Sequence, residues 1–281
     1  MNPLKIKYSW LLGVLISLVS CEDRLEDVEP PSFVEKLVVT SFISPADTVL
    51  YVSLQKNRPV FGELTYPLSI ETADVVLSDG SHSISLVNTG PGEFSIPVRL
   101  FPITDGKHYT LSVKTPDGLI ASAECDVPFS RNLTVSSEYI NSGMYSNYRC
   151  KIKVMDFAGE KNYYKVTAYQ VLYRRSSGKF GQMSEIVIDK PIFSDAGNDG
   201  KELVTLTSQF NYNYGTDVDS AFIKVSILNT DYQFYKYHVS LSSYNEGSDP
   251  FSEVTPVYSN INNGLGVFCA YTQNIYKFRL K

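Results

Sequence analysis

Hydrophobic and polar residues alternate at every second position along most of the chain after residue 36. Residues 36–43 and 48–54 show this alternation first, and turn-forming residues then recur about every eight to twelve positions. A period of two is typical of half-buried strands, because successive side chains of a strand point to opposite faces. Short strands between regular turns are typical of antiparallel sandwiches and barrels, so we predict an all-β protein.

The first half of the chain contains two strong hairpin patterns. The strand patterns of residues 74–78 and 109–113 lead into turns at Asp79-Gly80 and Asp117-Gly118. An Asp-Gly pair favours a tight hairpin because glycine adopts positive φ without a steric penalty. With about seven strands in this half, we predict an immunoglobulin-like β-sandwich over residues 35–128.

Strand patterns continue in the second half, where we predict a second antiparallel β-domain over residues 129–281. Its longest candidate strand covers residues 162–173, and the others cover residues 148–155, 185–188, 203–207, 222–228 and 267–271. Sixteen of the 20 tyrosines follow residue 130. Tyrosine has a high strand propensity and an amphipathic ring, so we expect half-buried sheet positions; a sugar- or peptide-binding face is the alternative.

One short helix is predicted inside this second domain. Asn229-Thr230-Asp231 supplies capping residues, and Phe234, Tyr237 and Leu241 then fall on one helical face at spacings of three and four residues. A strand in which every second residue from Tyr235 faces inward is the competing interpretation. We favour the helix.

The N-terminus has the layout of a bacterial lipoprotein precursor. Two lysines give a positive start, residues 10–19 form an apolar core, and the small residue Ser20 directly precedes Cys21. We therefore predict a signal peptide over residues 1–20 and a lipid attached to Cys21. Acyl chains on this cysteine would hold the mature protein at a membrane without spanning it.

Two other interpretations compete with this lipoprotein signal. A transmembrane helix needs about 20 apolar residues, whereas residues 10–19 supply ten, so a membrane span is excluded on length. A signal that is cut without lipidation stays open, because Ser20 would also serve an ordinary signal peptidase. Residues 21–34 form an acidic tether, which resembles the export tag of lipoproteins displayed on the outer cell surface.

Charge and cysteine spacing exclude several classes of protein. The chain has 25 basic and 30 acidic residues, a net charge of −5, and removal of residues 1–20 with their two lysines makes it −7. Nucleic-acid binding requires clustered Lys and Arg, so an acidic protein is a poor match. Cys125, Cys150 and Cys269 are too widely spaced for a disulfide framework or a zinc site. We expect buried thiols, with a Cys125–Cys150 disulfide as the alternative.

No set of residues in the sequence predicts catalysis. His82, His108 and His238 lie in separate predicted elements, and none has a second ligand three or four residues away. Residues 195–200 resemble a calcium loop faintly, but Leu206 stands where a bidentate glutamate is required, so we expect a flexible hairpin tip. We predict a non-enzymatic protein without a cofactor or metal; a carboxylate pair that only the fold brings together would be invisible in the sequence.

Several segments share the pattern of one known family. They are residues 35–39, 73–80 and 106–111, the Asp117-Gly118 turn before Pro128, residues 249–253 and residues 258–268. In these segments the chain resembles the outer-membrane lipoproteins of Bacteroidota-type bacteria that form domain-of-unknown-function family 4249. The most specific part is residues 258–268, in which Gly264 and Gly266 allow positive φ or close backbone approach, so we interpret it as a structural closure.

The resemblance implies a cell-envelope lipoprotein that often accompanies TonB-dependent outer-membrane transporters, with no established enzymatic activity. From it we expect a lipid-anchored outer-membrane protein that faces the cell exterior and serves such a transporter as an accessory or ligand-binding partner. An adhesin or envelope-assembly module is the alternative, and a hydrolase in the second domain is a more distant one. The sequence identifies neither the ligand nor the transporter.

Overall fold

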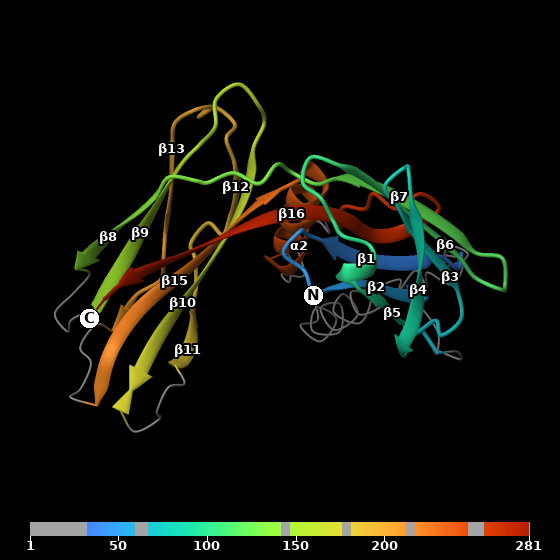
Figure 1. Cartoon of the computed structure of the whole chain (residues 1–281), viewed down its shortest axis with the longest axis horizontal. Coiled ribbons are helices and arrows are strands. Elements are labelled where there is room, and N and C mark those ends of the chain that lie inside the picture. Colours follow the sequence, from blue (N-terminus) through green and yellow to red (C-terminus); the bar gives the residue numbers. More distant parts are fainter. Residues whose placement is uncertain are drawn as a thin grey trace, which may run out of the picture. The chain divides into compact units, whose positions relative to one another are not determined.

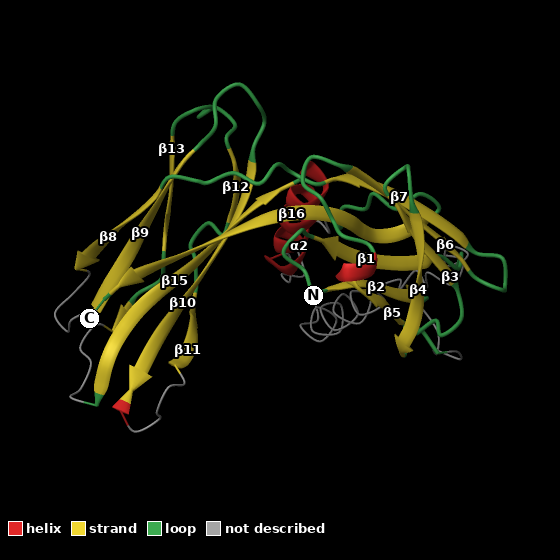
Figure 2. Ribbon diagram, viewed as in Figure 1, coloured by secondary structure: helices red, strands yellow, loops and turns green. Residues whose placement is uncertain are grey.

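The computed structural model describes residues 33–59, 67–141, 147–175, 181–211, 217–246 and 256–280. Cys21, the predicted signal peptide, most of the acidic tether and residues 249–253 lie outside these ranges. Within these ranges the fold is all-β with one α-helix, which confirms the predicted class (Figure 2). Within the described ranges, no helix combines the length and apolar character needed to cross a membrane.

The first half of the chain forms seven described strands, as expected. They are β1 (Leu37–Ile43), β2 (Val49–Lys56), β3 (Asp74–Ser78), β4 (Ser83–Gly90), β5 (Glu93–Pro97), β6 (His108–Lys114) and β7 (Ile120–Asp126), with a short 3-10 turn at Val98–Leu100. Their alternating pattern matches their burial. In β6, for example, Tyr109, Leu111 and Val113 are buried, whereas the residues between them are exposed.

The second half contains the remaining strands and the helix. They are β8 (Val135–Asn141), β9 (Asn147–Met155), β10 (Tyr163–Arg174), β11 (Gly181–Ile186), β12 (Ile192–Ser194), β13 (Glu202–Leu206), β14 (Phe210–Asn211), β15 (Val218–Thr230), helix α2 (Tyr232–Glu246) and β16 (Gly264–Arg279). The helix confirms our preferred interpretation of residues 229–241, and the competing strand is wrong. β16, with 16 residues, is longer than β10, which we expected to be the longest strand.

These strands form one large sheet and one small sheet (Figure 1). The large sheet has 12 strands in the order β11-β10-β15-β16-β1-β2-β5-β4-β3-β6-β7, with β12 added beside β10. The small sheet has four strands, in which β9 pairs with β8, β13 and β14. All these elements belong to one compact unit of the chain.

Strand β16 joins the strands of the two halves. Its first part pairs with β1 in parallel, from Leu37 opposite Gly264 to Ile43 opposite Ala270, and its second part pairs with β15 in antiparallel fashion. The parallel pairing differs from the antiparallel arrangement that we expected, because hydrophobic alternation shows which face of a strand is buried and not which partner it has.

The glycines of the closing segment make this parallel pairing possible. Gly266 has φ +104°, and a Cβ atom there would overlap the Val39 carbonyl oxygen. Asn260 supports the same segment, because its side chain donates to the Phe268 carbonyl oxygen at 2.7 Å and accepts from the Phe268 N–H at 3.0 Å. Residues 260–268 therefore hold β16 beside β1, as expected for the structural closure predicted at residues 258–268.

The two faces of the large sheet carry different layers. On one face of β16, Phe268 and Ala270 belong to the core of the first half, and Tyr276 and Phe278 pack against the core of the second half, which the small sheet helps to enclose. On the opposite face, Cys269 belongs to a third cluster with Phe234 of α2. Helix α2 therefore covers the face of the sheet that is turned away from both main cores.

Candidate functional site

A polar pocket of about 330 Å³ lies where β7 and β15 end and helix α2 begins. Its lining consists of Gly106, residues 126–129, Arg131, residues 160–163 and residues 229–233. Four segments that are distant in sequence therefore contribute to one pocket. Strand ends and loops are common locations for binding sites. The volume is at the lower end of the roughly 300–1,000 Å³ that is usual for ligand pockets.

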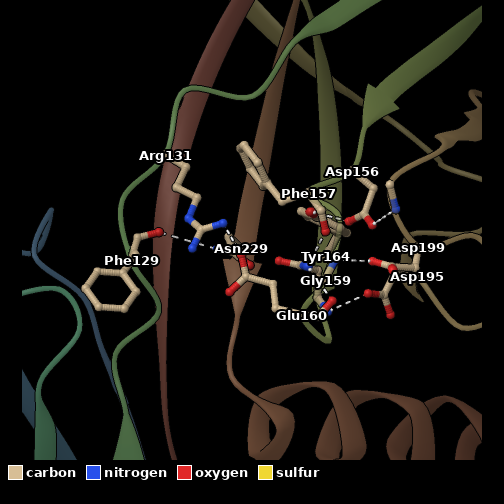
Figure 3. Close-up of polar contacts among 12 residues, drawn as sticks. Phe129, Arg131, Asp156, Phe157, Gly159, Glu160, Tyr164, Asp195, Asp199 and Asn229 are labelled. Atoms are coloured by element: carbon tan, nitrogen blue, oxygen red, sulfur yellow. Dashed lines mark hydrogen bonds and ion pairs between the residues drawn. The ribbon is translucent and has the colours of Figure 1, made fainter.

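An ion pair between Arg131 and Glu160 forms one side of this pocket. The Arg131 guanidinium also lies 4.8 Å from the centre of the Phe157 ring, which is a cation–π distance. Figure 3 shows the pair beside Asn229, whose amide donates a hydrogen bond to the Phe129 carbonyl oxygen at 3.4 Å. Because the two opposite charges contact each other, the pair adds no net charge to the pocket.

Asp231 is a buried carboxylate at the start of α2. One of its oxygens accepts the Phe234 N–H at 2.7 Å, and the other accepts the Ala270 N–H at 3.0 Å. Burial raises the pKa of Asp231 to about 7, although both hydrogen bonds act in the opposite direction. Since both oxygens have backbone donors, Asp231 caps the helix and ties its first turn to β16.

Tyrosines form the aromatic edge of the pocket. The Tyr163 ring lies 5.5 Å from the Tyr232 ring and 4.9 Å from the Tyr235 ring, measured between centroids. These are ordinary aromatic contact distances. Tyr232 is 48 % exposed, so its ring is accessible to a bound molecule. Most other described tyrosines of this half are partly buried, as expected for sheet positions.

Three aspartates gather next to this pocket. Carboxylate oxygens of Asp156, Asp195 and Asp199 all lie within 4.8 Å of one another, and Asp156 and Asp195 are buried. Oxygen atoms in such a group could ligate Ca²⁺. The sequence pointed to residues 195–200 alone, and the fold adds Asp156, which follows β9. No local pattern could have revealed that pairing, because about 40 residues separate the two segments.

Each of these carboxylates also accepts hydrogen bonds from the chain. The donors are the Tyr164 hydroxyl at 2.7 Å and the Gly200 N–H at 3.0 Å for Asp156, the Asn162 N–H at 2.9 Å for Asp195, and the Gly159 N–H at 2.9 Å for Asp199 (Figure 3). The expectation of a hairpin tip at residues 195–200 is wrong, because β12 pairs with β10 in the large sheet and β13 pairs with β9 in the small one. The loop links two sheets and is fixed by Asp156.

The three histidines lie on separate elements, as the sequence indicated. His82 is in the exposed turn between β3 and β4, and His108 of β6 lies 2.9 Å from Asp126, measured from Nδ1 to Oδ1. His238 lies in α2, where its ring is stacked on Phe42 at 5.8 Å between centroids. Burial, with Lys165 as a second cause, lowers the pKa of His238 to about 4, so this histidine is neutral near pH 7.

The cysteines outside the N-terminal segment are buried thiols. Cys125 belongs to the core of the first half and Cys150 to that of the second, and both are free, as is Cys269. The alternative of a Cys125–Cys150 disulfide is therefore wrong. Burial raises the pKa of Cys150 to about 12, which leaves this thiol protonated and unreactive.

Lys165 is a residue near the site that the sequence did not single out. Its Nζ lies 3.5 Å from His238 Nε2 and 5.4 Å from the centre of the Phe234 ring, and burial lowers its pKa. Lys165 occupies a position of β10 that alternates with the buried residues Tyr164 and Val166, as is typical of an exposed strand face. Only the packing of α2 on that face reveals that the lysine is covered, and no sequence pattern predicted this packing.

Comparison with known proteins gives one result. No curated protein matches the chain. A family model described as "Domain of unknown function (DUF4249)" matches residues 23–276, a range that includes every element from β1 to β15, helix α2 and most of β16. The chain therefore belongs to the DUF4249 family.

Proposed function

We propose that this chain is a non-enzymatic lipoprotein of the outer membrane that serves a TonB-dependent nutrient transporter as an accessory or ligand-binding partner. In this proposal Cys21 carries the lipid, and the acidic tether places the protein on the outer surface of the cell. The observation that carries the binding role is the pocket at the start of α2, which aromatic and amide side chains line together with the Arg131–Glu160 ion pair.

The chemistry of this pocket favours binding over catalysis. Its described lining includes no serine, cysteine or histidine that could form a nucleophile and its base. Asp231 has a raised pKa, which is a common property of a general acid, but both its oxygens accept backbone N–H groups of α2 and β16. Glu160 contacts Arg131. Asp231 and Glu160 are thus engaged in holding the fold.

The anchor is tested by fatty-acid labelling in cells. Cys21→Ala should abolish incorporation of radiolabelled palmitate and release the protein from membranes or stall its maturation, because in this proposal Cys21 carries the lipid. Cys150→Ala is the matched control, since Cys150 is a buried thiol, and it should label as the wild type does. Labelling of the Cys21→Ala protein at wild-type levels would contradict the proposal.

The partner and the role of the pocket are tested together. The wild-type protein should recover a β-barrel transporter from outer membranes solubilised in a mild detergent, and Tyr232→Ala should reduce nutrient uptake through it. Tyr244→Ala is the control, because Tyr244 is 52 % exposed on the same helix but does not line the pocket. Recovery without any transporter, in cells that express one, would count against the proposal, as would equal uptake by the two variants.

A further inference from the structure

The face of the large sheet that carries α2 continues beyond the helix as a surface that is open among the described residues. Odd-numbered residues of β16 lie on this face, with Cys269 beneath α2 and Lys277 farther along the strand. The open part contains a separate pocket of about 280 Å³, which is lined by Val171, Tyr173, Ser220, Phe222, Lys224 and Lys277. It shares no lining residue with the pocket at the start of α2, so the inference below does not rest on the proposed function.

The floor of this second pocket is aromatic and apolar. The Tyr173 and Phe222 rings meet edge to face, with centroids 6.0 Å apart and an interplanar angle of 86°. Val171 lies directly opposite Phe222 on the neighbouring strand and is buried. A planar apolar group would find ring surface and a methyl group here, in the offset or edge-on arrangements that aromatic pairs favour.

Two lysines border the same pocket and face each other. Lys224 of β15 is the cross-strand partner of Lys277 of β16. Like charges directly opposite each other destabilise a sheet. Within the described ranges, neither ammonium group forms an ion pair with a carboxylate of the chain. The acidic residue nearest in register is Glu185, which pairs with Tyr169, the strand neighbour of Lys224. The Cα atoms of Glu185 and Lys224 are therefore two strand spacings apart, about 10 Å.

We infer that the open face binds a small aromatic anion, with its anionic group between Lys224 and Lys277 and its ring against Phe222 and Tyr173. The anionic group supplies the negative charge that the described residues of the chain do not place beside the lysine pair. Charge-assisted hydrogen bonds to two ammonium groups are stronger than neutral ones. The pocket volume, just below the roughly 300 Å³ at which pockets for drug-sized ligands begin, favours a ligand of one ring.

Phenyl phosphate is a suitable probe, because it combines one ring with one anionic group. The full chain is studied in uncharged detergent micelles, and binding is followed by phosphorus NMR. Inorganic phosphate tests the anion without the ring, and phenol, added as a competitor, tests the ring without the anion. We expect phenyl phosphate to bind at least about tenfold more tightly than inorganic phosphate or phenol, because inorganic phosphate lacks the ring contacts and phenol lacks the contacts with the lysines.

Variants locate the binding and separate it from folding. Lys224→Gln and Lys277→Gln should each weaken phenyl phosphate binding about tenfold, the loss expected for one charge-assisted hydrogen bond. Both variants should unfold at a higher temperature than the wild type without ligand, because each removes the repulsion. Lys114→Gln is the control, since Lys114 lies on β6 opposite Asp74 and should bind normally. No measurable binding of phenyl phosphate, or equal binding by all the variants, would overturn the inference.

Discussion

One face of the large sheet ends in two very different environments. At one end α2 covers Lys165 of β10, whose ammonium group lies against the Phe234 ring and His238. At the other end Lys224 and Lys277 face each other, and no helix of the described residues lies above them. The same residue type on the same face thus has a desolvated charge in one place and an accessible charge in the other. What covers a strand face determines the properties of its charges more than the strand does.

The position of α2 depends on a few contacts at its first turn. Asp231 accepts the N–H of Phe234 in the helix and the N–H of Ala270 in β16, and Phe234 packs on Cys269 and Phe42. These contacts bind the helix to the middle of β16, where β1 also pairs. The covered end is therefore the part of the sheet face where α2 contacts β16. The open end is the part along the remainder of β16, which α2 does not reach.

A substitution that disturbs the pairing of β16 with β1 gives the largest expected effect. Gly266→Ala should lower the free energy of unfolding by more than about 3 kcal/mol, because residue 266 has φ +104° and its Cβ would overlap the Val39 carbonyl oxygen. The loss would be measured by urea denaturation. The control is Gly118→Ala, at φ +93° with no atom within 4 Å of the added Cβ, where only the backbone cost of about 1–2 kcal/mol is expected. Equal losses would show that the close approach to β1 is unimportant.

Release of the helix from the covered end is the next largest effect. Asp231→Ala should lower the free energy of unfolding by about 2 kcal/mol, because the Phe234 and Ala270 N–H groups lose a buried acceptor. Far-ultraviolet circular dichroism should show whether helix content falls at the same time. A loss below about 0.5 kcal/mol, the range of ordinary surface substitutions, would mean that α2 stays on the sheet without its cap.

The same variant has a pH dependence of defined sign. The pKa of Asp231 in the folded state, about 7, lies above the ordinary 3.8, so ionisation disfavours the folded state. The contribution of this group to stability is complete below about pH 4, falls between about pH 4 and pH 7, and is constant above. The stability difference between the wild type and Asp231→Ala should therefore be larger at about pH 4 than at about pH 8. An unchanged difference would contradict the raised pKa.

Sequence patterns predicted the elements of this comparison better than their contacts. The strand alternation, the helix and its cap Asp231 follow from local rules, because periodicity and capping depend on neighbours in the chain. The parallel pairing of β1 with β16, the approach of Asp156 to residues 195–200 and the cover over Lys165 depend on partners far away in the sequence. The sequence therefore indicated only residues 195–200 of the carboxylate group beside the pocket, and it did not indicate the pairing of Lys224 with Lys277.

Replacement of the covered lysine should have a smaller effect of opposite sign. Lys165→Met should raise the free energy of unfolding by about 1 kcal/mol near pH 7, because the methionine fills the space without a desolvated charge. Burial lowers the pKa of Lys165 below its ordinary value of 10.5. As the pH approaches 10.5, the unfolded wild type therefore binds more protons than the folded protein, so the free energy of unfolding of the wild type should rise with pH there. The variant should lack this rise. Lys114→Met, at an exposed position on β6, should change stability little, and a destabilised Lys165→Met would show that the amine contributes a favourable contact.

The smallest effect tests the open end and distinguishes local repulsion from total charge. Lys277→Glu places a carboxylate opposite Lys224 and should raise the free energy of unfolding by about 0.5 kcal/mol, the middle of the range for cross-strand charge pairs. The matched variant is Lys114→Glu, which makes the same change in net charge but creates a like-charged pair with Asp74 and should lower stability by a similar amount. Added salt should shrink both differences, because the side chains are in contact with solvent. If both variants shift stability in the same direction, the net charge of the chain governs the result, and the lysines of the open end do not repel each other enough to call for a bound anion.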